Sequence, residues 1–255
     1  MTGFRIRSWL NYWLDATDEH SLHSPFLFDL YTQVIKPRIG LLPEAEALRQ
    51  TLLKNRKELI YDDPGAGSAA IKKKRTVAEL AKISTTPPRY AALYARLANW
   101  ANAKYVVELG TCLGLTTLYL AGQRREVTTF EGVPQLADMA QLHFEKTGAT
   151  GIQIVRGNID KTLRPTLENM PQVDFALIDA NHRYQPVLHY TDLLFRKIHS
   201  NSVIVVDDIH WNEEMEKAWN ELRQHQLVYC SVDLFRCGLL FFNPSVYRQH
   251  VVLQF

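Results

Sequence analysis

The sequence predicts an α/β fold: a doubly wound, mostly parallel, seven-stranded sheet with a C-terminal β-hairpin and an N-terminal helical cap. Three observations predict it. From Lys104 onward, short apolar runs alternate with helix-like segments, which is typical of parallel strands joined by crossover helices. Several of these runs end in a carboxylate. After the last helix-like segment, runs 227–234 and 238–242 are separated by only a few residues, which allows a hairpin and is too short for a helical crossover.

The elements of this sheet domain can be placed in order along the chain. Short apolar runs rich in β-branched residues predict strands at 105–109, 127–130, 152–155, 173–178 and 202–206. The apolar spacing between these runs predicts helices at 114–122, 135–147, 161–169, 184–198 and 213–225. Pro87 and Pro88 open a further helix that runs to about Trp100. We therefore assign residues 85–255 to one domain.

Residues 1–84 are predicted to form the helical cap together with a glycine loop. Aromatic residues stand among charges between residues 4 and 31, a pattern that suits short amphipathic helices packed on the main domain or on a second subunit. The stretch 62–68 reads Asp-Asp-Pro-Gly-Ala-Gly-Ser and cannot continue a helix. We expect residues 62–75 to form a loop that acts either as a lid over a ligand or as a plain linker. Its basic end, 72–75, is expected to be a solvated helix start or loop.

Composition excludes several classes of protein. With 255 residues and 46% hydrophobic content, the chain can bury a full core. The 29 Lys and Arg nearly balance the 27 Asp and Glu, for a formal charge of +2, so no nucleic-acid footprint is indicated. Cys112, Cys230 and Cys237 lack the spacing of a disulfide framework or a zinc site, which favours a reducing cytoplasm. Arg5 and Arg7 interrupt the N-terminal apolar residues, so neither a signal peptide nor a membrane span is expected.

Carboxylates follow the predicted strands one after another. The positions are Glu108, Glu131, Asp179, Asp207 and Asp208. In an open parallel sheet the carboxyl ends of the strands form the ligand crevice, so these side chains are expected to line a single site. This repetition indicates an enzyme more strongly than any one motif does.

The turn after the first sheet strand, residues 108–114, reads Glu-Leu-Gly-Thr-Cys-Leu-Gly. Five parallel units, this E-L-G-T-x-x-G turn and a terminal hairpin resemble the class I S-adenosylmethionine-dependent methyltransferases over about residues 85–245. Residues 178–184, Ile-Asp-Ala-Asn-His-Arg-Tyr, are similar to the Ile-Asp-Gly-x-His-x-Tyr segment of bacterial small-molecule O-methyltransferases related to the catechol and caffeoyl-CoA types. A dinucleotide-binding G-x-G-x-x-G pattern is not matched, because position 112 is Cys.

The resemblance implies S-adenosylmethionine as cofactor and a set of residues that bind it. Glycines in the turn let backbone amides approach the methionine portion, threonines donate hydrogen bonds, and Glu108 faces the amino group. Glu131 takes the position of the acid that accepts hydrogen bonds from both ribose hydroxyls. The residues implied to bind the cofactor are Glu108, Gly110, Thr111, Gly114, Thr116, Glu131, Asn158, Ile159, Asp160 and Asp179.

The resemblance also implies where the chemistry takes place. Methyl transfer is an in-line displacement, so the protein aligns the acceptor and helps to remove its proton. Asp179, His182 and Asp207 are the candidate catalytic residues, with His182 as base; the alternative is that His182 only caps a helix or binds a loop carbonyl. Asp179, Asp207 and Asp208 are candidate ligands of a divalent cation such as Mg²⁺; alternatively, the Asp pair caps the next helix.

Three functions are compatible with these residues. The first is O-methylation of a small hydroxylated acceptor. The second is nucleic-acid or amine methylation, whose enzymes typically carry Asn/Asp-Pro-Pro-aromatic after the fourth strand, where residues 179–182 read Asp-Ala-Asn-His. The third is a non-catalytic S-adenosylmethionine-binding protein, which the fold alone does not exclude. The expected partner is a small-molecule acceptor, and no nucleic acid or membrane is expected; the aromatic N-terminal segment is compatible both with packing inside the chain and with a homo-oligomer.

Overall fold

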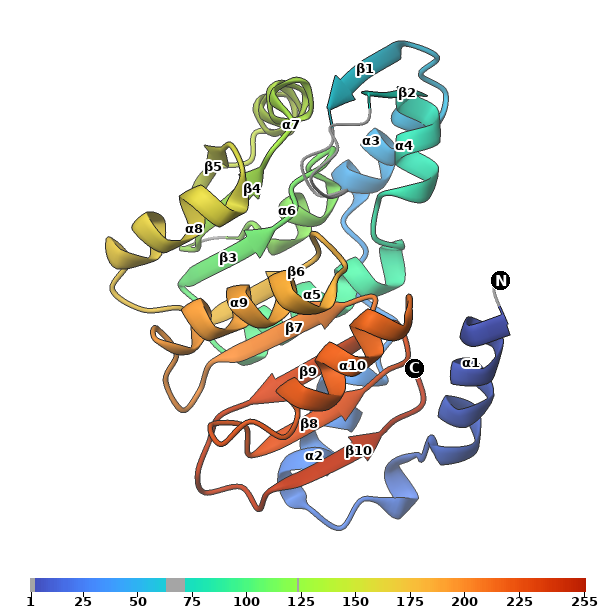
Figure 1. The fold of residues 1–255 in the computed structure, drawn as a ribbon, viewed down its shortest axis with the longest axis vertical. Helices are drawn as coiled ribbons and strands as arrows, with labels where there is room; N and C mark the ends of the chain where they lie inside the picture. Colours follow the sequence, from blue (N-terminus) through green and yellow to red (C-terminus); the bar gives the residue numbers. More distant parts are fainter. Residues whose placement is uncertain (1–2, 63–71, 123) are drawn as a thin grey trace.

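The computed structural model describes residues 3–62, 72–122 and 124–255. The main body is an eight-stranded sheet with helices on both faces, and a separate two-stranded sheet lies at one end (Figure 1). The predicted α/β architecture is thereby confirmed. Residues 63–71, the central part of the predicted lid or linker, lie outside the described residues.

The large sheet is parallel except at one strand. Its order is β10-β8-β9-β7-β6-β3-β4-β5, and β9 is the strand that pairs antiparallel with both neighbours. The bounds of its strands are β3 (Tyr105–Leu109), β4 (Glu126–Glu131), β5 (Ile152–Arg156), β6 (Phe175–Ile178), β7 (Val203–Asp207), β8 (Cys230–Asp233), β9 (Cys237–Phe241) and β10 (Gln249–Val252). The terminal hairpin is the predicted one.

The predicted count of seven strands is wrong by one. The four residues of β10 pair in parallel with β8 at the margin of the sheet. The run is only four residues long and half of it is polar, so it is visible as a strand only once the free edge of β8 lies beside it.

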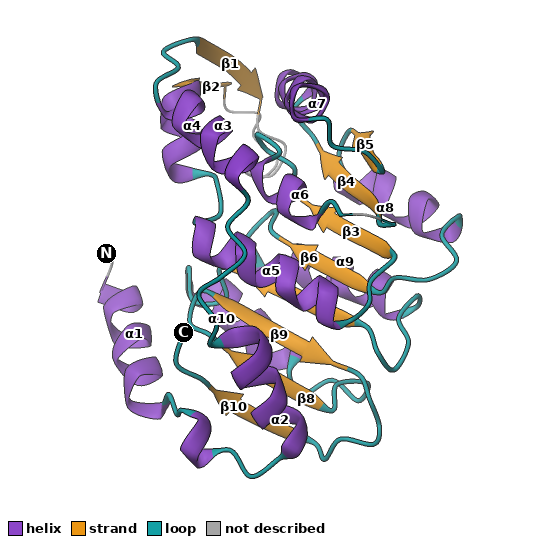
Figure 2. Ribbon diagram, turned by 180° about the vertical axis from the view of Figure 1, so that it is seen from behind, coloured by secondary structure: helices purple, strands orange, loops and turns teal. Residues whose placement is uncertain are grey.

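Helices cover both faces of the sheet (Figures 1 and 2). Their bounds are α5 (Pro88–Trp100), α6 (Leu115–Leu120), α7 (Pro134–Thr147), α8 (Ile159–Glu168), α9 (Tyr184–Phe195) and α10 (Glu213–Leu222). Side chains of α8, α9 and α10 form one buried cluster with the sheet. Those of α5 pack on the opposite face, and α6 and α7 join them there. Because both faces are covered, β6 and β7 are apolar at nearly every position, which is typical of parallel strands.

The N-terminal third is helical in most of its length. It contains α1 (Gly3–Asp15), a single turn η1 (Glu19–Ser21), α2 (Pro25–Asp29), a π-helical turn η2 (Leu30–Ile35), α3 (Pro43–Leu53) and α4 (Val77–Ile83). The α2–η2 segment contributes buried residues to the cluster on the α5 face of the sheet. The expectation of N-terminal helices is thereby confirmed for these segments.

The expectation of a loop or helix start at the basic run is wrong. Residues Lys72–Thr76 form strand β2, which pairs antiparallel with β1 (Glu58–Asp62). In β1 buried and exposed residues alternate, with Leu59 and Tyr61 turned inward, so the hairpin covers α4 with one face and exposes the other. Lys74 forms a 3.0 Å ion pair with Glu58 across the two strands. The charged composition of this run predicts a solvated loop or helix start, but pairing with β1 makes it a strand.

Among the described helices, none combines the length and apolar character needed to span a bilayer.

Candidate functional site

The ends of four neighbouring strands place the predicted carboxylates in one row. Leu109 of β3 pairs with Phe130 of β4 on one side and with Ile178 of β6 on the other, and Ile178 pairs with Val206 of β7. The next residue along the chain is Gly110 after β3, Glu131 in β4, Asp179 after β6 and Asp207 in β7. The register thus brings together side chains that are up to about a hundred positions apart in the chain, as expected for the carboxyl edge of a parallel sheet.

A cavity of about 730 Å³ opens along this edge. That volume lies within the ordinary range of small-molecule sites. The predicted functional residues that line it are Gly110, Glu131, Asn158, Ile159, Asp179, His182 and Asp208. Residues from the N-terminal third also contribute to its wall, among them Tyr61 and the segment Ile83–Thr86. These residues therefore form part of the cavity wall, and a cap over a bound ligand stays a prediction.

Gly110 is required by a close approach between two turns. Its φ is +106°, and an added Cβ would lie 2.3 Å from the backbone oxygen of Asp179. The N–H groups of Gly110 and Thr111 both donate to the carbonyl of Phe130, at 3.1 Å each. Cys112 follows with φ +50°, a rare conformation for a residue with a side chain. The turn is thus built tightly against the ends of β4 and β6.

Gly114 serves packing rather than the cavity. Its φ is +78° at the N-terminus of α6, and an added Cβ would lie 2.6 Å from Cε1 of Phe144 in α7. It is not part of the cavity wall formed by the described residues. The missing side chain makes room for an aromatic ring, and a contact of Gly114 with the cofactor stays a prediction.

Glu131 is held in a defined orientation at the cavity wall. Its Oε2 accepts the N–H of Cys112 and its Oε1 accepts the N–H of Val133, both at 2.8 Å. The residue is 8% exposed. Two backbone donors therefore fix the carboxylate before any ligand arrives, which is the preorganisation that a polar recognition group requires.

Glu108 lies one layer deeper, beneath the turn. Its Oε2 accepts the hydroxyls of Thr117 and Thr129 at 2.5 and 2.6 Å, while Oε1 is buried without a hydrogen-bond partner in the described ranges. Burial raises the pKa of Glu108 to about 7, against the lowering effect of these hydroxyls. Thr111 and Thr116 are buried as well, and the Thr111 hydroxyl pairs with that of Thr129 at 2.6 Å. None of these three predicted cofactor residues is among the described residues that line the cavity.

The turn after β5 is shaped by Asn158. Its Oδ1 accepts the N–H of Asp160 at 2.8 Å and so caps the N-terminus of α8. Asn158 and Ile159 line the cavity, whereas the described lining does not include Asp160. The Asp160 carboxylate instead accepts the hydroxyl of Tyr190 at 2.6 Å. Tyr190 itself lines the cavity; the sequence shows it only as an aromatic residue on a helix.

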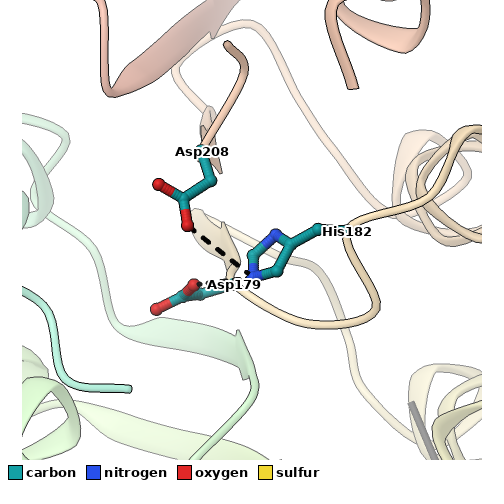
Figure 3. Close-up of side chains that lie close together, drawn as sticks. All are labelled: Asp179, His182 and Asp208. Atoms are coloured by element: carbon teal, nitrogen blue, oxygen red, sulfur yellow. Dashed lines mark ion pairs between the residues drawn. The ribbon is translucent and has the colours of Figure 1, made fainter. Parts of the chain in front are cut away.

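Asp179, His182 and Asp208 converge at the other end of the cavity (Figure 3). The Nε2 of His182 lies 3.7 Å from Oδ1 of Asp179 and 3.9 Å from Oδ2 of Asp208. One ligand atom from each of the three residues lies within 4.8 Å of the others, so together they could hold a metal ion. Asp208 has φ +55°, and Asn181, next to His182, has φ +54°. Both turns thus adopt a conformation that is uncommon outside glycine and that recurs at functional sites.

The two carboxyl groups of this cluster resist ionisation. Burial, followed by the charges of Asp207 and Asp208, raises the pKa of Asp179 well above its usual range. Burial and Asp207 also raise the pKa of Asp208, although Arg236 and then His182 act in the opposite direction. Carboxylates this close cannot all be charged without a compensating cation. The cluster therefore favours a proton or a positively charged ligand.

Asp207 is engaged by other side chains, and its role as a metal ligand stays a prediction. Its carboxylate is fully buried and accepts Nη2 of Arg236 at 2.9 Å and Nε at 3.1 Å. Tyr94 donates its hydroxyl to the same carboxylate at 2.8 Å. The possible metal-binding group contains His182 in its place. Arg236 comes from the turn of the β8–β9 hairpin, where nothing in the sequence pattern marks it as part of a site.

Trp211 and Thr86 complete this end of the cavity. Trp211 lines it, as the position after the β7 carboxylates suggests, whereas His210 turns away to pair with Asp233 at 2.8 Å. The Thr86 hydroxyl, which precedes α5, lies 3.3 Å from Oδ2 of Asp179. The guanidinium of Arg5 stacks over the Trp211 ring at 4.5 Å. Arg5 of α1 and Thr86 before α5 thus reach this end of the cavity from elements that are not part of the sheet.

Comparisons with known proteins agree with this geometry. The family described as a methyltransferase domain matches residues 107–209. Catechol O-methyltransferase of Mycobacterium tuberculosis is 32% identical over 155 residues, which are 59% of this chain and 67% of that enzyme.

Two solved structures share the fold. A methyltransferase from Podospora anserina with bound SAH aligns with a TM-score of 0.62 at 13% identity, covering 87% of this chain and 97% of that one. A putative caffeoyl-CoA O-methyltransferase from Staphylococcus aureus aligns with a TM-score of 0.59 at 16% identity, covering 86% and 98%. With the sheet order and the strand-end cavity, these similarities show that the chain belongs to the class I S-adenosylmethionine-dependent methyltransferases and is related to the catechol O-methyltransferases.

Proposed function

We propose that this protein transfers a methyl group from S-adenosylmethionine to a hydroxyl of a small acceptor. The observation that carries the proposal is the shape of the cavity, which joins a preorganised carboxylate, Glu131, to the cluster of Asp179, His182 and Asp208. The end of the cavity at Glu131 suits a nucleoside, and the end at the cluster suits an acceptor hydroxyl that loses its proton. The similarity to a catechol O-methyltransferase supports a hydroxylated acceptor.

At the cofactor end, each residue has a proposed contact. Glu131, whose carboxylate is oriented by two backbone N–H groups at the cavity wall, would accept the ribose hydroxyls. Asn158 and Ile159 would border the adenine, and the turn at Gly110 would pass close to the methionine portion. Glu108 would act from beneath the turn, where its carboxylate accepts the Thr117 and Thr129 hydroxyls.

At the acceptor end, the donor set fits a divalent cation. Asp179, His182 and Asp208 would hold it. The two carboxylate oxygens suit Mg²⁺ or Mn²⁺, and the imidazole nitrogen suits ions such as Zn²⁺ or Fe²⁺ that favour nitrogen. The ion would lower the pKa of a bound acceptor hydroxyl. The raised pKa values of both carboxyl groups support a site that gains from an added positive charge.

The protein's own groups then position the acceptor and receive its proton. Without an ion, Nε2 of His182 is the proposed proton acceptor, because it faces the cavity between two carboxyl groups. Trp211 and Thr86 would border the acceptor and exclude water from it. Arg236 would act by holding Asp207, not by touching the reacting atoms.

The test combines three measurements on the purified chain. Calorimetric titration with S-adenosylhomocysteine tests the cofactor end, and methyl transfer to a panel of catechols tests activity, each with EDTA or with Mn²⁺ added. Electron paramagnetic resonance of Mn²⁺ then tests the cation site in His182→Ala and Asp208→Asn. His20→Ala, which removes an exposed imidazole on η1, is the matched control.

The outcomes separate the roles. Loss of Mn²⁺ binding in both site variants, but not in the control, supports the cation site. Transfer that persists in EDTA and falls in His182→Ala assigns the imidazole as base. Cofactor binding without transfer to any hydroxylated acceptor contradicts the O-methyltransferase proposal, and absence of saturable cofactor binding contradicts the site as a whole.

A further inference from the structure

Helix α1 is oriented with its polar side toward the protein. Arg5, Ser8 and Tyr12, spaced three and four residues apart, lie on one side of the helix. Ser8 is 2% exposed, Arg5 stacks over Trp211, and the Tyr12 ring packs against Phe235 with centroids 5.3 Å apart. The usual arrangement of an amphipathic helix, with its apolar side inward, is therefore reversed.

The outward side of α1 is apolar and carries large side chains. We call this set the α1 stripe, and its exposed fractions are 48% for Ile6, 44% for Trp9, 46% for Leu10, 63% for Trp13 and 71% for Leu14. The spacing of these residues gives one continuous band along the helix. Two exposed tryptophans in one band are unusual for a surface that faces only water.

The helix is anchored in this orientation at its C-terminal end. The Tyr12 hydroxyl donates to the carbonyl of Leu253 at 2.7 Å and accepts the N–H of Phe255 at 3.2 Å. Thr17, just beyond the helix, forms a parallel bridge with Leu253. Figures 1 and 2 show α1 at the margin of the molecule, near the chain's C-terminus. Rotating the helix to bury the stripe would break these contacts and expose Tyr12.

The size of the α1 stripe is that of half a small interface. The five side chains together expose roughly 600 Å², taking about 200 to 250 Å² for a fully exposed side chain of this size. This is at the upper end of the patches found on monomers. Two such bands facing each other would bury about 1,200 Å², which is the lower limit of a specific protein–protein interface.

The chemistry of the stripe selects a second copy of the chain over other partners. A two-fold axis requires a self-complementary surface, and an uncharged apolar band meets that requirement. Interfaces between identical subunits are also the more apolar class and are rich in tryptophan. A membrane-surface helix needs a band of Lys and Arg beside its apolar side, but Arg5 is turned inward and Arg7 is the one other basic residue of α1.

We propose that the α1 stripe is the contact surface of a homodimer, in which α1 of one copy packs against α1 of the other around a two-fold axis. The proposal is independent of the methyl-transfer reaction.

The test measures mass in solution on the full chain. We expect the wild type to sediment as a dimer over the micromolar range and Leu10→Glu and Trp13→Glu to sediment as monomers. Leu142→Glu is the matched control, because Leu142 is a 53% exposed leucine on another helix, α7, and this variant should remain dimeric. Unchanged circular dichroism and S-adenosylhomocysteine binding would show that the variants are folded.

A second variant keeps the proposal testable if the Glu variants do not fold. Leu10→Cys should form an intermolecular disulfide under mild oxidation, whereas Leu142→Cys should not. Leu10 is in the middle of the stripe, where the proposed two-fold axis would cross and a position meets its own copy. A monomeric wild type, a dimer that persists in Trp13→Glu, or flotation of the monomer with anionic vesicles would each overturn the proposal.

Discussion

Replacement of Glu108 by Gln tests how strongly burial opposes a charge beneath the glycine turn. The Glu108 carboxyl is fully buried, and its pKa is raised from the ordinary 4.5 to about 7, chiefly by burial. The hydrogen bonds from Thr117 and Thr129 offset part of that effect, and the charge of Glu131 adds to it. Since one pKa unit corresponds to 1.36 kcal/mol, the charged form destabilises the folded protein by about 3 kcal/mol.

The direction of the pH dependence follows from this raised pKa. Between pH 4.5 and about 7 the folded state binds more protons at Glu108 than the unfolded state does. The contribution of Glu108 is therefore favourable below this window and is lost as the pH rises through it. Gln carries no charge at either pH, so Glu108→Gln should be within about 1 kcal/mol of the wild type near pH 5 and more stable than it at pH 8 by about 3 kcal/mol.

Urea unfolding of the cofactor-free protein at both pH values measures the difference. Because other titrating groups are shared by both proteins, their effects cancel in the comparison. In thermal unfolding, the same change corresponds to a Tm higher by about 5 to 10 °C for a chain of this size. A stability difference that is the same at pH 5 and pH 8 would refute the reasoning.

Three further substitutions test the site and its support. Glu131→Gln should weaken S-adenosylhomocysteine binding by about 1 to 3 kcal/mol in calorimetry, and an unchanged affinity would remove Glu131 from the ribose site. Gly114→Ala should lower the free energy of unfolding by about 1 to 3 kcal/mol, because the added Cβ meets Phe144 at positive φ, and urea unfolding measures it. Arg236→Met should cost about 3 to 5 kcal/mol by leaving Asp207 buried and unpaired, and the double variant with Asp207→Asn should recover most of that loss.

Local patterns were sufficient for the parallel part of the sheet. The run 105–109 is apolar because both faces of β3 are covered, and the predicted bounds agree with the structure. The helix at 88–100 was visible from its proline start and its apolar spacing. Strand β10 and the hairpin of β1 and β2 were not predicted, because short or highly charged runs become strands only through the partner beside them.

In the site, too, some residues were predictable from local patterns and others depended on tertiary partners. Strand-end positions marked Glu131 and Asp179 as cavity residues, since a parallel register carries the ends of neighbouring strands to one edge. They did not separate Asp207 from Asp208, which are adjacent in sequence and point in different directions. The pairing of Asp207 with Arg236, contributed by a distant hairpin, decided that His182 and not Asp207 joins the cluster.

The sequence by itself determined the order of the crossover strands and helices, the family and the edge of the sheet that carries the chemistry, because these depend on periodicity and on residues close together in the chain. Only the tertiary structure decided which carboxylates are neutralised internally, which glycine serves packing, and which side of α1 faces outward. Those outcomes depend on burial and on partners brought together by folding. Neither is encoded in any local stretch of the chain.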